Sequence, residues 1–279
     1  MIATARGWAT VLALISVTLI LISCSGESGP QPGTPAFDFG AAKNTFAAGD
    51  YVKTLDNLDR VAATENECTP KARAWLLVLT SGMTRGYTEL ADRFENGARM
   101  NRTDPGSFRR NMTQYRGEAG RLALHFAQVF GDFQKSKDDT VTLAFPYPTG
   151  SANPPMTLTK IAGGMLVPPA EVEMAQRQNI ERAVLLAACA SVGAPEDVAK
   201  THSVFSTPEV KVPRATFVTA MAAALFDQSQ LFSRQKLDDP SKLKIFCTRA
   251  QDALKGLPES KESKELGEKI EKSLKVSKT

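Results

Sequence analysis

Apolar residues recur at helical spacing through most of this 279-residue chain, and this pattern constrains the fold more than any other feature. It fills two long stretches, 36–131 and 169–257. Three of the expected helices begin after an aspartate that can cap them, at Asp50, Asp104 and Asp239. We therefore expect a mainly α fold in which the helices pack as a bundle or as hairpins.

One segment breaks the helical pattern. Alternate residues from Val141 to Tyr147 are apolar, which is the periodicity of a strand. A turn-rich stretch follows, and residues 156–159 can return as a second strand. We expect residues 140–161 to form a β-hairpin that covers the helical core, within an insertion at 132–168.

The first 23 residues differ from the rest of the chain. Arg6 is their only charge, and an uncharged, largely apolar run follows it from Gly7 to Ser23. This is the layout of a secretory signal peptide. The run ends in the sequence Leu21-Ile22-Ser23-Cys24, which resembles the lipobox of bacterial lipoproteins.

The resemblance to lipoproteins implies a fate for Cys24. Its thiol would be diacylglycerated and residues 1–23 removed, so that the acyl chains hold the protein in the membrane. Ser25 resembles an outer-membrane address, which would leave the protein facing the periplasm. Residues 24–35 are rich in Ser, Gly and Pro and are expected to form a flexible tether. A signal peptide cleaved without lipidation and an uncleaved membrane span are the alternatives.

A second resemblance covers about a quarter of the chain. Residues 36–66, with a turn at Gly49, look like one tetratricopeptide unit, and a weaker second unit would have Trp75 in its first helix and Gly86 at its turn. A helical bundle without repeats is the alternative. The expected organisation is a signal peptide at 1–23, a tether at 24–35, a tetratricopeptide-like region at 36–131, the β-hairpin insertion at 132–168, a C-terminal helical region that packs on the first at 169–257, and a charged helical tail at 258–279.

Three cysteines remain if Cys24 is lipidated. Cys189 and Cys247 lie on apolar helical segments, whereas Cys68 lies in a polar loop. Because exported proteins leave the reducing cytosol, we expect a Cys189–Cys247 disulfide. The alternative is that all three are free, since unpaired cysteine is often buried.

The sequence lacks the motifs of catalysis. It contains no HExxH, GxSxG, P-loop or GxGxxG, and no CxxC pair that would indicate a zinc site. Its two histidines, His125 and His202, are far apart and are expected to be structural. The formal net charge of +4 is too small to require nucleic acid as a partner. We therefore expect no enzyme activity, metal, cofactor or nucleic acid partner.

Arginine is concentrated in one region. Residues 85–121 contain eight arginines and no lysine. The guanidinium group suits the binding of carboxylate or phosphate, so an anion-binding surface is one interpretation, and ion pairing within the protein is the other. The residues expected to form such a surface are Arg102, Arg109, Arg110 and Arg116.

These patterns favour a binding role over a catalytic one. We expect a lipid-anchored periplasmic scaffold or partner-binding module whose protein partner is unidentified. The alternative is a lipoprotein that binds a small ligand or accompanies a transporter, because tetratricopeptide-like lipoproteins of that kind exist. An enzyme is the third and least favoured reading.

Overall fold

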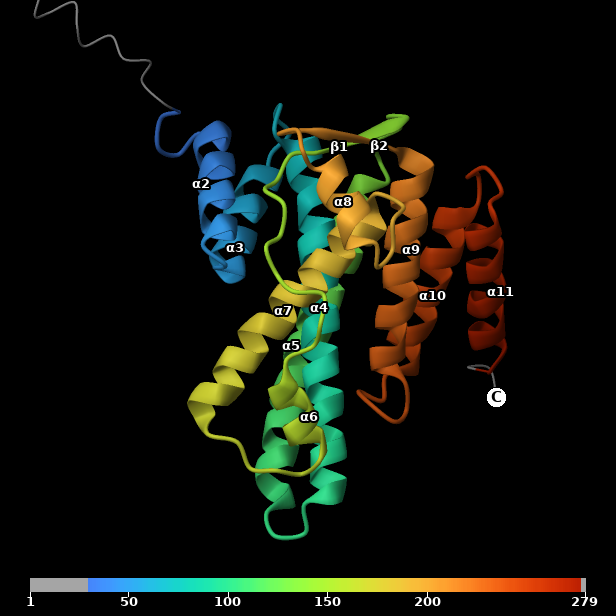
Figure 1. Cartoon of the computed structure of the whole chain (residues 1–279). Coiled ribbons are helices and arrows are strands. Elements are labelled where there is room, and N and C mark those ends of the chain that lie inside the picture. The colour runs from blue at the N-terminus through green and yellow to red at the C-terminus, as the bar shows by residue number, and fades with distance from the viewer. Residues whose placement is uncertain (1–29, 277–279) are drawn as a thin grey trace, which may run out of the picture.

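The computed structural model describes residues 30–276 (Figure 1). At its centre are two long antiparallel helices, α4 (Thr69–Met100, 32 residues) and α5 (Pro105–Phe133, 29 residues). Asp104 caps α5, as the sequence predicts, because its carboxylate accepts a hydrogen bond from the Ser107 N–H (3.1 Å). The two helices reach from the upper part of the molecule to its lower end and set its length.

A helical hairpin packs beside the first half of α4. It consists of α2 (Pro35–Ala47) and α3 (Tyr51–Ala62), joined through Gly49, whose φ of +73° is readily adopted only by glycine. The ring of Phe46 meets the ring of Trp75 edge to face, with 5.3 Å between their centroids. This aromatic contact fixes the hairpin on the central helices.

Helix α7 (Pro169–Ser191) crosses α4 at two glycines. A Cβ on Gly82 would lie 2.5 Å from the Cα of Val184, and one on Gly86 would lie 3.1 Å from the Cα of Ile180. Helix α4 continues unbroken through Gly86, so the turn expected there for a second tetratricopeptide unit is wrong. The glycine serves a close helix crossing rather than a turn.

The small sheet has one of its two expected strands. β1 (Thr140–Leu143) forms where the alternation predicts it, but its antiparallel partner is β2 (Val210–Pro213), which is distant in the chain. The expected return strand at 156–159 is wrong, because these residues belong to the short helix α6 (Met156–Ala162).

β1 and the residues directly after it belong to the core, so the expectation that this segment covers the core is wrong. Phe145 is buried and stacks on Trp75, with 5.4 Å between ring centroids. Val141 and Leu143 are also buried and belong to the same hydrophobic cluster as Trp75. Removal of this segment would therefore open the main core.

The C-terminal third is helical and continues the same core. Ile270 in the last helix is fully buried, so that helix docks on the molecule. The elements of this part are α8 (Val198–Val204), α9 (Arg214–Ser229), the 3₁₀ turn η1 (Gln230–Phe232), α10 (Pro240–Leu254) and α11 (Lys261–Val276).

The hydrophobic core has two parts. The larger draws residues from α2 to α5, both strands, α7, α9, η1, α10 and α11, and a smaller one, which includes α6, lies at the lower end of the α4–α5 pair. The prediction of a mainly α fold with one small antiparallel strand pair is confirmed. Within residues 30–276, no helix combines the length and apolar character needed to cross a bilayer.

The three described cysteines are free thiols. The Cys247 sulfur lies 3.3 Å from the Ser229 hydroxyl, whereas Cys189 hydrogen bonds with the Thr201 side chain. The predicted Cys189–Cys247 disulfide is thus not formed in this structure, because the two helices place the thiols among different neighbours. Burial raises the pKa of the Cys189 thiol, which keeps it protonated and unreactive.

Candidate binding site at the end of the helical hairpin

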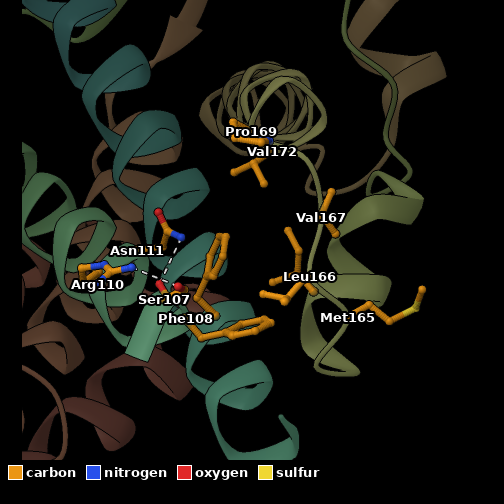
Figure 2. A pocket seen from close by; sticks show the side chains of 11 residues that line it. Ser107, Phe108, Arg110, Asn111, Met165, Leu166, Val167, Pro169 and Val172 are labelled. Carbon is orange, nitrogen blue, oxygen red and sulfur yellow. Dashed lines mark hydrogen bonds between the residues drawn. The ribbon is translucent and has the colours of Figure 1, made fainter. Parts of the chain in front are cut away.

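A cavity of about 350 Å³, here called the tip pocket, opens at the lower end of the molecule (Figure 2). One wall comes from the start of α5, and the facing wall comes from the segment that links α6 to α7 and from the first turn of α7. The pocket is mostly apolar, with a polar edge on the α5 side. The residues that line it are Phe94, Ser107, Phe108, Arg110, Asn111, Ile161, Met165, Leu166, Val167, Pro169 and Val172.

Two glycines allow α6 and its linker to approach the central helices. A Cβ on Gly97 would lie 2.4 Å from the Ile161 carbonyl oxygen and 2.5 Å from the Phe108 ring. Gly164 has a φ of +81°, and its carbonyl accepts a hydrogen bond from the side-chain amide of Asn101 (2.8 Å). The linker is thereby fixed in place, so the pocket is largely preformed.

Exposed hydrophobic side chains are frequent on the elements that form this pocket, and two of them, Met165 and Leu166, line it. Five of the nine large hydrophobic side chains exposed within residues 30–276 lie on the elements that form this end of the molecule. Four of the five are methionines, whose flexible and polarisable side chains adapt to varied partners. These residues and their exposed fractions are Met100 (65%), Met156 (79%), Met165 (57%), Leu166 (62%) and Met174 (60%).

The four arginines expected to bind anions differ in their partners, and Arg110 lies close enough to Asp104 that, besides the hydrogen bonds from Ser107, its charge lowers the pKa of that carboxyl. Arg102 and Arg109 have no carboxylate within 4.0 Å among residues 30–276, and Arg110 donates only to the Ser107 hydroxyl, at 3.0 Å. Arg116 is different: its side chain is buried and forms an ion pair with Glu95 at 2.8 Å. Arg116 is therefore structural, and the predicted anion-binding surface keeps Arg102, Arg109 and Arg110 as candidates.

The tip pocket holds no catalytic arrangement. No histidine or cysteine lines it, and its one ionisable side chain is Arg110. His125 hydrogen bonds to Asp59 at 3.0 Å, and the His202 ring meets Tyr147 edge to face at 5.1 Å. In the part of the chain that the structure describes, no three His, Cys, Asp or Glu residues converge to hold a metal. The geometry suits binding through apolar contact and charge.

A second cavity, of about 380 Å³, lies between α4, α7 and α9. Gln228 borders it and is buried, and neither atom of its side-chain amide has a hydrogen-bond partner within residues 30–276. Asp227 lies beside it, and the surrounding protein raises the pKa of its carboxyl. Unpaired buried amides are rare in folded proteins, so this cavity has the polar groups to orient a small molecule.

Of the four arginines predicted from the sequence, Arg110 lines the tip pocket, whereas the sequence does not predict the apolar part of the pocket. Met165 and Leu166 are distant from α5 in sequence, and only the return of the chain through α6 brings them to the same pocket. The exposed pair Met165-Leu166, which follows Gly163-Gly164, is the one local signal that could have indicated the site. No family model, no curated protein and no solved structure matches this chain.

Proposed function

We propose that this protein is a lipid-anchored, non-enzymatic partner-binding protein of the bacterial cell envelope, and that its partner occupies the tip pocket. The observation that carries the proposal is the apolar pocket, edged by the exposed side chains of Met165 and Leu166, with Arg110 in its lining. A surface of this kind offers apolar burial for affinity and positive charge for orientation.

The chemistry of the site defines the partner segment. An apolar side chain would enter between Phe108 and Leu166, where it would be removed from water. Carboxylates beside it would pair with Arg102, Arg109 and Arg110. We therefore expect an amphipathic segment that presents one apolar side chain together with acidic neighbours.

The lipid anchor would lie at the other end of the molecule. Helix α2, close to the start of the described residues, lies at the upper end in Figure 1, whereas the tip pocket lies at the far end of α4. A helix of 32 residues is about 48 Å long. Acyl chains on Cys24 would thus attach the molecule at the end opposite the tip pocket, which would leave the pocket accessible to a protein partner in the periplasm.

The partner-binding role is tested by photo-crosslinking in living cells. Leu166→p-benzoylphenylalanine places the crosslinker at the pocket rim, and Ile245→p-benzoylphenylalanine on α10 is the matched control, because Ile245 is also an exposed hydrophobe. We expect one discrete adduct at position 166 and none at position 245. Equal labelling at both positions, or no adduct at position 166, would contradict the proposal.

The contribution of charge is tested on the same adduct. Changing Arg102, Arg109 and Arg110 together to glutamine should weaken the adduct at position 166 by about tenfold. Changing Lys261, Lys264 and Lys272 of α11 to glutamine removes the same charge elsewhere and should leave the adduct unchanged.

The anchor is tested separately. Cys24→Ala should abolish the incorporation of labelled palmitate and release the protein from the membrane fraction, whereas Cys68→Ala should change neither. Unchanged incorporation in the Cys24 variant would contradict lipidation and leave the tip pocket proposal untouched.

A small-ligand role has one observation in its favour, the unpaired amide of Gln228 at the second cavity. Native mass spectrometry of the protein purified from its host tests this alternative. A bound small molecule that is lost in Gln228→Leu and retained in Gln230→Leu, on the exposed side of η1, would support it.

A further inference from the structure

The cavity between α4, α7 and α9 has walls of different character. Apart from the last turn of α9, the wall from α7 and α9 is apolar and consists of five alanines with Leu186 and Met221. The wall from α4 is polar and follows one face of that helix, through Ser81, Thr84, Arg85, Thr88 and Glu89. The cavity therefore offers a polar strip and an apolar surface to the same bound molecule.

Gln228 contributes an unpaired amide to this cavity from the last turn of α9. It lies four residues after Ala224 and seven after Met221, so the three share the helix face that lines the cavity. Helical side chains lean toward the N-terminus, which carries the Gln228 side chain back over that face. Gln228 is only 5% exposed, and neither Oε1 nor Nε2 has a hydrogen-bond partner within residues 30–276. Buried amides are normally paired, so both atoms are available to a bound molecule.

The charges that line the cavity each have an opposite charge close by. Arg85 pairs with Glu89 at 3.3 Å, and Arg182 pairs with the same carboxylate at 2.7 Å. Asp227 is exposed at the rim, where desolvation raises the pKa of its carboxyl and the nearby charges of Arg85 and Lys269 oppose that rise. The balance of charge favours an uncharged ligand over an ion.

The threonine hydroxyls on the α4 wall already use their hydrogens. Thr84 donates to the Thr80 carbonyl and Thr88 donates to the Thr84 carbonyl, each at 2.7 Å. Their oxygens can only accept, whereas the amide of Gln228 holds a donor and an acceptor side by side. A ligand group that offers an acceptor and a donor in the matching order would satisfy both atoms of this amide.

We propose that this cavity binds an uncharged small molecule that carries a primary amide or a lactam, which pairs with the Gln228 amide through two hydrogen bonds while its apolar part lies against the alanines of α7 and α9. Primary amides and lactams hold an N–H and a C=O on one edge, as Gln228 does, so two of them can pair head to head. Water could satisfy the Gln228 amide but would leave the apolar wall wet, and a ligand with an apolar part displaces that water. This ligand class rests on the small-ligand alternative for the same cavity and is independent of the tip pocket.

The probe is benzamide, titrated into the isotope-labelled full chain in detergent and followed by the amide signals of Ala223, Ala224 and the Gln228 side chain. We expect saturable shifts with a Kd on the order of 1 mM, as suits so small a ligand. N,N-dimethylbenzamide has no donor, and benzoate has no donor and carries a charge. Each should bind at least about tenfold more weakly, because a buried amide rejects an analogue that leaves it unpaired.

Matched variants test the amide and the space. Gln228→Leu should abolish the preference for benzamide over N,N-dimethylbenzamide, whereas Gln230→Leu, on the exposed side of η1, should retain it. Ala224→Leu fills the cavity and should weaken benzamide binding by more than about tenfold. Ala215→Leu, in the first turn of α9 and outside the lining, should change it by less than about twofold.

The comparison of the three ligands is made on the unaltered protein, so it remains decisive if a variant fails to fold. Absence of saturable shifts up to about 10 mM benzamide would overturn the proposal, as would equal binding of N,N-dimethylbenzamide or benzoate. A molecule found by native mass spectrometry in a protein that does not bind benzamide would overturn this ligand class and keep the small-ligand alternative. None of these results bears on the crosslink at position 166, so the tip pocket proposal fails or stands separately.

Discussion

At the scale of single residues, the closest backbone approach of α4 and α7 depends on the absence of a side chain at Gly82. A Cβ there would lie 2.5 Å from the Cα of Val184, which is backbone and cannot rotate away. We expect Gly82→Ala to lower the free energy of unfolding by about 2 kcal/mol, measured by urea denaturation.

The control for this prediction is Gly117→Ala on the exposed face of α5, where an added Cβ meets nothing within 4 Å. That change should stabilise the protein by about 0.5–1 kcal/mol, because alanine is the better helix former. If both variants changed the free energy of unfolding by the same amount, α4 and α7 would not cross closely at Gly82.

The buried ion pair between Arg116 and Glu95 makes stability depend on pH. Burial alone would raise the pKa of the Glu95 carboxyl, but the hydrogen bond and charge of Arg116, with Arg99, outweigh it and lower the pKa. A lowered pKa in the folded state contributes stability above the unfolded value of about 4.3 and loses it as the pH falls further.

We therefore expect Arg116→Gln to cost about 2 kcal/mol at neutral pH, and this difference from the wild type to shrink as the pH falls below about 4. Arg99→Gln affects the same carboxylate from an exposed position and should cost less than about 0.5 kcal/mol. Denaturation curves at several pH values measure both, and a cost that does not depend on pH would contradict this account.

The sequence predicts helix caps well, but it does not predict ion pairs between helices. Asp50, Asp104 and Asp239 each accept a hydrogen bond from the backbone N–H three residues later, as expected, because capping is a local interaction. The structural role of Arg116 depends on Glu95 in another helix, and spacing along the chain does not reveal such a pair.

At the scale of elements, α6 shows where periodicity fails as a guide. Residues 156–159 alternate like a strand, but Leu158 and Ile161 are three apart and both are buried, which suits a helix equally well. Four residues are too few to separate the two periods. The true partner of β1 is distant in sequence, so only the folded core selects it.

The smaller hydrophobic cluster should open independently of the main core. We expect Ile161→Ala to speed hydrogen exchange of the α6 amides without affecting those of α9, because Ile161 packs only in the smaller cluster. Met156→Ala, on the exposed side of α6, should change neither. Equal acceleration in α6 and α9, measured by mass spectrometry, would show that the two clusters open together.

At the scale of the whole molecule, stability should not depend on the redox state. The three described thiols are free, so a reducing agent should leave the melting temperature unchanged, and alkylation after unfolding should label Cys68, Cys189 and Cys247. A fall in melting temperature on reduction would instead support the disulfide that the sequence suggested.

The length of α4 limits how much of the molecule a partner at the tip pocket can cover. The pocket lies at the end of this 32-residue helix, about 48 Å from its start. A partner bound there would contact the elements around the smaller hydrophobic cluster and would leave those around the larger one, including α9 to α11, exposed to a second protein.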